Sequence, residues 1–128
     1  MRIQLRHNLP FVTVRVTYRG LSVDVPDVLV DTGSGGTILS ADALEPIGVS
    51  LESNEVLDSL RGVGGREYVF KRVVDRLEVE GHGLDRFRIE VGGMDYGFAI
   101  SGILGMNFLV PLGAIIDLQE QELEFAAG

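Results

Sequence analysis

The sequence has no cysteine, no tryptophan and a single lysine, Lys71. Without cysteine the chain can form neither a disulfide nor a zinc site with thiolate ligands. Basic residues are also few, 11 against 19 acidic ones, which leaves a formal net charge of -8. Because such a chain repels phosphate backbones, we expect no nucleic-acid partner. We also expect no metal and no cofactor.

We expect no secretion signal either, because residues 1–10, MRIQLRHNLP, contain no apolar core. We therefore expect a cytoplasmic protein. Residues 96–116, YGFAISGILGMNFLVPLGAII, carry no charge and are long enough to span a bilayer. The run holds four glycines, a proline and an asparagine, so we interpret it as a buried strand, a short helix and a second strand. We expect no membrane association.

What the chain does have is a period of two in its apolar residues. Residues 11–18, FVTVRVTY, alternate in this way, as do residues 86–91, RFRIEV. This pattern is typical of strands with one face in the core and one in water. Val28, Leu29 and Val30 are apolar on both faces, which indicates a central strand, and Pro26 before them suggests an irregular strand start.

Helix signals are few. Ser40 is a suitable N-cap for residues 41–47, and Gly48 follows directly after them. Residues 103–109 are a second candidate, ended by Pro111. We find no linker in the 128 residues. The sequence therefore predicts one domain, residues 1–128, of the all-β class with mostly antiparallel strands and one or two short helices.

The run VLVDTGSGGT, residues 28–37, ends an apolar strand on the carboxylate of Asp31. A buried carboxylate costs free energy unless hydrogen bonds compensate it. The small residues that follow can turn sharply and supply donors. One interpretation is a plain Asx-turn, with Asp31 bonded to its own downstream amides. A phosphate cradle lacks G-x-x-x-x-G-K-[ST], and a nucleophile at Ser34 lacks G-x-S-x-G.

A further interpretation is acid–base chemistry by paired carboxylates. The run VLVDTGS, residues 28–34, resembles the active-site strand of the aspartic proteases. That family also carries two hydrophobic residues and a glycine ahead of a short helix, matched here by Ile103, Leu104 and Gly105. Between the two motifs it places a glycine-rich hairpin called the flap, matched here by Gly62, Val63, Gly64 and Gly65.

The chain contains a single Asp-Thr-Gly, which resembles the retropepsin-like branch, where two identical subunits each supply one aspartate. The run GILGMNFL, residues 102–109, is most similar to small bacterial members. The resemblance implies a single-lobe acid-protease fold, a closed or partly open β-barrel. It also implies a homodimer in which residues 2–6 and 121–125 interleave between the two chains.

The resemblance also implies roles for individual residues. Asp31 of each subunit is then catalytic, and Thr32 bonds across the dimer to the partner loop. Gly33 permits the close approach and donates its N–H to the carboxylate. The hydroxyl of Ser34 bonds the outer carboxylate oxygen, and Gly105 lets the apolar strand pass close under the loop.

The function that this implies is an aspartic endopeptidase. Its carboxylate pair activates a water that hydrolyses peptide bonds of a peptide or protein substrate, without an acyl-enzyme. The alternative is a dimeric module of the same fold that binds peptides or acts as a scaffold without cutting them.

Overall fold

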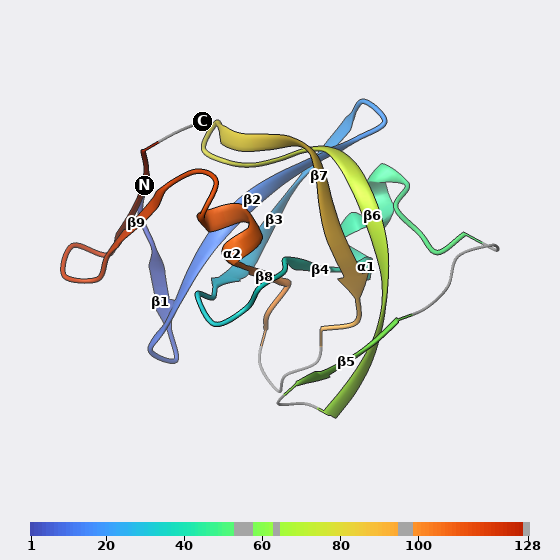
Figure 1. Ribbon diagram of the computed structural model, residues 1–128, viewed down its shortest axis with the longest axis horizontal. Coiled ribbons are helices and arrows are strands. Elements are labelled where there is room, and N and C mark those ends of the chain that lie inside the picture. The colour runs from blue at the N-terminus through green and yellow to red at the C-terminus, as the bar shows by residue number, and fades with distance from the viewer. Residues whose placement is uncertain (53–57, 63–64, 95–98, 127–128) are drawn as a thin grey trace.

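The computed structural model describes residues 1–52, 58–62, 65–94 and 99–126, most of them in β-strands (Figure 1). The strands are β1 (Gln4–Arg6), β2 (Leu9–Tyr18), β3 (Leu21–Val30), β4 (Ile38–Ser40), β5 (Asp58–Gly62), β6 (Gly65–Val79), β7 (His82–Gly92), β8 (Gly102–Leu104), β9 (Ala114–Asp117) and β10 (Glu122–Phe125). The helices are α1 (Ala41–Leu44), the 3-10 turn η1 (Glu45–Ile47) and α2 (Met106–Leu109).

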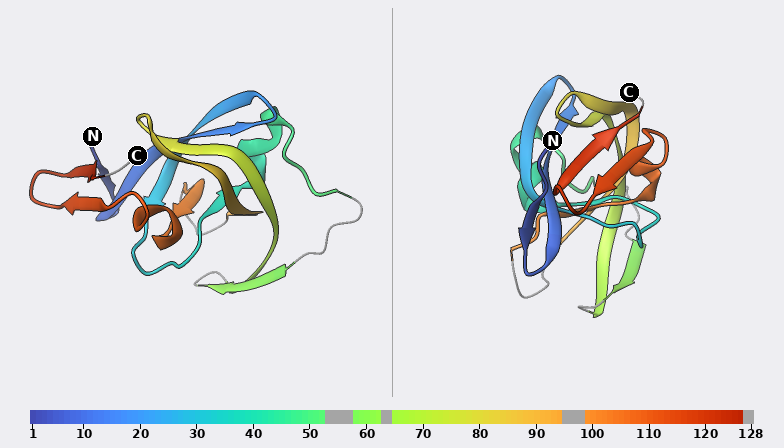
Figure 2. Two further views of the ribbon diagram at one scale, coloured as in Figure 1. Left: turned by 45° about the horizontal axis from the view of Figure 1, so that its top comes forward. Right: turned by 90° about the vertical axis from the view of Figure 1, so that its left-hand side faces the viewer.

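Six strands close into a barrel in the order β2-β3-β8-β4-β7-β6, because β6 also pairs with β2. This closure consists of three antiparallel residue pairs, from Arg15 opposite Glu78 to Thr17 opposite Arg76. Strands β1 and β5 extend the sheet beyond the barrel, and β9 and β10 form a separate hairpin (Figure 2). The prediction of an all-β, retropepsin-like barrel is confirmed.

The alternating pattern sorts side chains between core and solvent as expected. In β2, Val12, Val14 and Val16 are buried, whereas Thr13 and Arg15 are exposed. In β7 the corresponding alternation buries Phe87, Ile89 and Val91 and exposes both arginines. Removing these side chains from water is the main favourable term that holds the barrel together.

Strand β3 is central, since it pairs with β2 on one side and with β8 on the other. The expectation that Pro26 begins this strand is wrong, because β3 starts at Leu21 and Pro26 lies inside it. Between Val25 and Val28 the register against β2 shifts, and Asp27 has a φ of 61°. A proline without an N–H is tolerated at such a bulge, where the ladder is already interrupted.

The helical segments are short. The Ser40 hydroxyl accepts the Ala43 N–H at 3.5 Å and caps α1, which continues into η1 and ends at Gly48 with a φ of 84°. The second helix is shorter than residues 103–109, because Ile103 and Leu104 belong to β8. Their pairing with β3 holds them extended, so the helix begins only after Gly105.

The uncharged run at residues 96–116 is described from residue 99 onward and forms β8, α2 and β9, the strand, helix and strand expected. Among the residues that the structure describes, no helix is both long and apolar enough to cross a membrane. The N-terminal residues pair with β10 of the same chain: Ile3 N–H donates to Gln121 O at 2.8 Å and Leu123 N–H to Met1 O at 2.9 Å. These two ends are therefore joined within one chain.

Candidate active site

Asp31 lies directly after β3, where the strand leaves the barrel. Its N–H donates to the carbonyl of Leu104 at 3.0 Å, which extends the parallel pairing of β3 with β8 by one more bond. The residue is half-buried, whereas Val30 before it is 5% exposed. The carboxylate of Asp31 is therefore partly accessible, and the pairing of β3 with β8 fixes the position of its backbone.

The carboxylate is held by its own loop. Gly33 N–H donates to Asp31 Oδ1 at 2.8 Å, and Ser34 N–H donates to the Asp31 carbonyl at 3.2 Å. This geometry is the Asx-turn that the sequence allowed. Among the described residues, Asp31 Oδ2 has no hydrogen-bond partner. One oxygen is thus fixed by a backbone donor, and the other is available to a water, a substrate or a second carboxyl group.

Ser34 behaves differently from the expectation. Its hydroxyl donates to the carbonyl of Gly36 at 2.8 Å, not to the carboxylate of Asp31. A hydroxyl has one proton, so it cannot donate to both acceptors at once. Ser34 therefore closes the loop on itself rather than stabilising the carboxylate anion.

The loop is fastened to the start of α2. Met106 N–H donates to Ser34 O at 2.7 Å, and Asn107 N–H donates to Gly35 O at 3.1 Å. The first N–H groups of a helix have no partner inside the helix and need acceptors elsewhere. Here the carbonyl groups of the loop supply them, so helix and loop hold each other in place.

Thr37 completes this connection. It is 1% exposed, and its hydroxyl accepts Gly105 N–H at 3.1 Å while donating to Asn107 Oδ1 at 2.8 Å. Its carbonyl accepts the N–H of Glu90 in β7 at 2.9 Å. Sequence reasoning missed Thr37 and Asn107 as site residues. The signal in the sequence that could have identified Thr37 is its place as a hydroxyl residue directly before the apolar residues of β4.

Gly105 has the role expected of it, a close approach of two backbones. A Cβ at this position would overlap the carbonyl of Gly36 and would lie 2.8 Å from the carbonyl oxygen of Ser34. Ile103 is half-buried and Leu104 is completely buried, consistent with packing rather than chemistry. The structure thus brings Gly33, Ser34 and Gly105 together around Asp31.

Thr32 is exposed on the loop. Its expected partner lies on a second chain, so its role stays a prediction. Among the described residues there is no cluster of three histidine or acidic side chains suited to a metal ion.

The glycine-rich hairpin is described only in part. Strands β5 and β6 pair antiparallel up to Gly62 opposite Gly65, while Val63 and Gly64 lie outside the described residues. The two strands therefore lead toward a hairpin tip, and its role as a flap stays a prediction.

A family model matches the chain over most of its length. The model described as aspartyl protease covers residues 12–108, from β2 to the third residue of α2, and includes the Asp31 loop and Gly105. A search of curated proteins finds no matching relative.

Proposed function

The chain belongs to the aspartyl protease family, and on that premise we propose that it is an endopeptidase built from two identical chains. Each chain acts as one protease domain, residues 1–128, and contributes Asp31. The observation that carries the proposal is the Asp31 carboxylate, with one oxygen held by the Gly33 N–H and the other without a partner in the described chain.

The number of Asp-Thr-Gly motifs supports the homodimer. One Asp-Thr-Gly occurs in the sequence, whereas acid catalysis of this kind needs two carboxyl groups that share a proton. Two adjacent carboxylates cannot both ionise easily, so the pair titrates as a unit with one low and one high pKa. A twofold axis beside the loop supplies the second Asp31.

The chemistry of such a pair is direct hydrolysis. The ionised carboxylate takes a proton from a water, whose oxygen bonds to the carbonyl carbon of the peptide. The protonated carboxyl group donates to the carbonyl oxygen, and the amine leaves with a proton as the C–N bond breaks. Rigid positioning raises the rate of this step. The bonds from the loop to α2 supply that rigidity.

One surface beside the loop is suited to the dimer contact. Met106 and Val110 are 38% and 62% exposed on the outer side of α2, whereas Phe108 and Leu109 on its inner side are buried. Met106 is bonded directly to Ser34, so this apolar side lies next to the Asp31 loop. A second copy covering it also brings its own loop close.

The β5–β6 hairpin is the flap in this proposal. The hairpin extends beyond the barrel, since among the described strands β5 pairs only with β6, and β6 pairs with β7 only from Val69 onward. A hairpin supported on one side can bend toward a peptide and away from it. The substrate is then a peptide segment held between the hairpin and the two aspartates.

The test is digestion of a peptide library between pH ~4 and ~7, the range in which a shared-proton pair operates. Wild type is compared with Asp31→Asn and with the control Asp42→Asn, which changes an exposed carboxylate on α1. We expect cleavage by wild type and by Asp42→Asn alone. Cleavage that survives Asp31→Asn contradicts the mechanism. Absence of cleavage by all three supports the alternative, a dimeric module that binds peptides without cutting them.

A further inference from the structure

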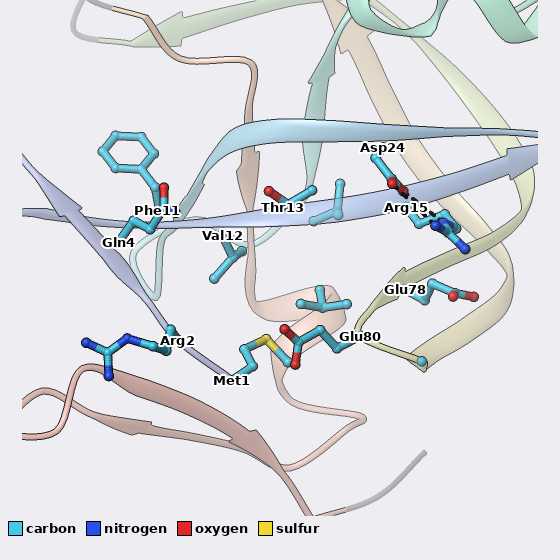
Figure 3. A pocket seen from close by; sticks show the side chains of 13 residues that line it. Met1, Arg2, Gln4, Phe11, Val12, Thr13, Arg15, Asp24, Glu78 and Glu80 are labelled. Atoms are coloured by element: carbon cyan, nitrogen blue, oxygen red, sulfur yellow. Dashed lines mark hydrogen bonds and ion pairs between the residues drawn. The ribbon is translucent and has the colours of Figure 1, made fainter.

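A cavity lies away from the Asp31 loop, along β2 (Figure 3). It has a volume of about 640 Å³, and no residue of the loop lines it. Its floor is β2 from Phe11 to Arg15, one end is formed by Met1 and Arg2, and the other is formed by the β6–β7 turn. A volume of this size is typical of binding sites for small molecules and short segments.

The cavity occupies a gap between strands. On this side of β2, Phe11 is paired with Gln4 of β1, and the next pair is Arg15 with Glu78 of β6. Among the described strands, none pairs on this side with the three residues between them, Val12, Thr13 and Val14. Three extended residues span about 10 Å.

Thr13 presents its backbone to this gap. The β1–β2 hairpin has a two-residue turn, so Leu9 opposite Arg6 directs its N–H and C=O toward β1. These directions alternate along a strand, so Thr13, four residues on, faces the same side as Leu9. Thr13 is exposed, and it has no cross-strand partner in the described sheet. The gap thus contains one free backbone donor and one free acceptor.

Along β2 at the gap, buried apolar side chains alternate with an exposed polar one, as is usual in a strand with one face in the core. Val12 and Val14, on either side of Thr13, are buried, and both line the cavity. Met1 lies between Arg2 and Glu80 (Figure 3). Arg2 stands at one end and Glu80 at the other, and neither has an ion-pair partner among the described residues. The cavity therefore combines an apolar floor with one free charge of each sign.

We propose that this cavity binds a short extended peptide segment, about three residues long, which adds to β2 as a strand between β1 and β6. Its central residue exchanges backbone hydrogen bonds with Thr13, in the manner of strand addition. Apolar side chains flanking that residue lie over Val12 and Val14. A basic group beyond them meets Glu80, and an acidic group meets Arg2. This site is separate from the proposed catalytic aspartate and does not depend on catalysis.

The test uses backbone amide NMR of the full chain carrying Asp31→Asn, so that the probe is not consumed. The probe is the peptide acetyl-Lys-Val-Thr-Val-Glu-amide, which places its lysine at Glu80 and its glutamate at Arg2 when it runs antiparallel to β2, as β1 and β6 do. Its matched control is the same peptide methylated on the threonine nitrogen. Two further protein variants are compared: Thr13→Pro removes the free donor, and Thr13→Ala keeps it. Proline is compatible with this position because the N–H faces the gap and not β3.

We expect saturable shifts at Arg2, Thr13 and Glu80 with the unmodified peptide. Loss of one hydrogen bond should weaken binding roughly threefold to tenfold, both for the methylated peptide and for Thr13→Pro. Thr13→Ala should bind as the parent does. Absence of saturable shifts at millimolar peptide overturns the proposal. Shifts confined to the Asp31 loop, or equal affinity of both peptides for all variants, overturn it as well.

Discussion

The hydroxyl of Thr37 donates to Asn107 Oδ1 at 2.8 Å across 70 residues of sequence. The same hydroxyl accepts the Gly105 N–H, so one buried group joins the loop that carries Asp31 to the first turn of α2. The position of the Asp31 carboxylate thus depends on the hydrogen bonds of the Thr37 hydroxyl, which is almost completely removed from water. Such contacts contribute little net stability when formed but are costly to break.

We expect Thr37→Val to lower the free energy of unfolding by about 1 to 3 kcal/mol, because it leaves the Gly105 N–H without its acceptor in a buried place. The shape of the side chain is unchanged, so lost packing contributes little. Urea unfolding followed by circular dichroism measures the difference. Thr37→Ser keeps the hydroxyl and should be affected less. Equal stability of wild type and Thr37→Val contradicts the role of this bond.

Gly105→Ala should destabilise the protein by about 3 kcal/mol or more, because its Cβ overlaps the carbonyl of Gly36 and neither backbone can move freely. The matched control is Gly35→Ala, whose Cβ would have no atom within 4 Å. Thermal unfolding of both variants compares them directly. If Gly105→Ala is as stable as Gly35→Ala, the close approach of loop and strand is not required.

Ser34→Ala should leave the acid side of the pH–rate profile in place, because the hydroxyl donates to Gly36 and not to the carboxylate of Asp31. The variant should instead lose about 1 kcal/mol of stability, the net value of a typical hydrogen bond. Peptide hydrolysis measured against pH, together with urea unfolding, separates the two effects. An acid side that moves upward would mean that Ser34 does stabilise the ionised aspartate.

The pKa of Asp24 lies below its ordinary value, chiefly because Arg15 donates a hydrogen bond to the carboxylate at 2.8 Å. The ionised form is favoured in the folded state, so its contribution to stability is present at neutral pH and disappears as the pH falls through the folded pKa. We expect Arg15→Gln to raise the pKa of Asp24 toward that of an isolated aspartate. Carboxyl ¹³C shifts measured against pH test this, with Arg19→Gln as the control. An unchanged midpoint contradicts the pairing.

Val110→Glu should weaken the proposed dimer at least about tenfold, because the twofold axis places two unpaired carboxylates in the contact. Leu21→Glu makes the same kind of change at a residue that is 57% exposed on the β2–β3 hairpin, and it should not alter the dimer. Sedimentation velocity over a range of concentrations measures both. Equal weakening by the two variants, or by neither, contradicts a dimer contact at α2.

Local patterns in the sequence determined much of this protein. The alternation in residues 11–18 predicted β2, Ser40 and Gly48 predicted the bounds of the first helical segment, and the small residues after Asp31 predicted a tight turn around a carboxylate. These features depend on contacts within a few residues, and the residue types themselves carry them. The Asp-Thr-Gly motif, joined to Ile103, Leu104 and Gly105, also pointed to the family that the comparison found.

Other features were decided only by the tertiary structure. The Ser34 hydroxyl donates to Gly36 and not to the Asp31 carboxylate, because the loop bends back on itself. The Thr37 hydroxyl donates to Asn107, because β4 and β8 pair side by side. The gap at Thr13 exists because β1 pairs with β2 only up to Phe11, whereas β6 pairs with β2 only from Arg15 onward. Hydrogen-bond partners of this kind are distant in sequence, and they are set by how the barrel closes, which no local pattern encodes.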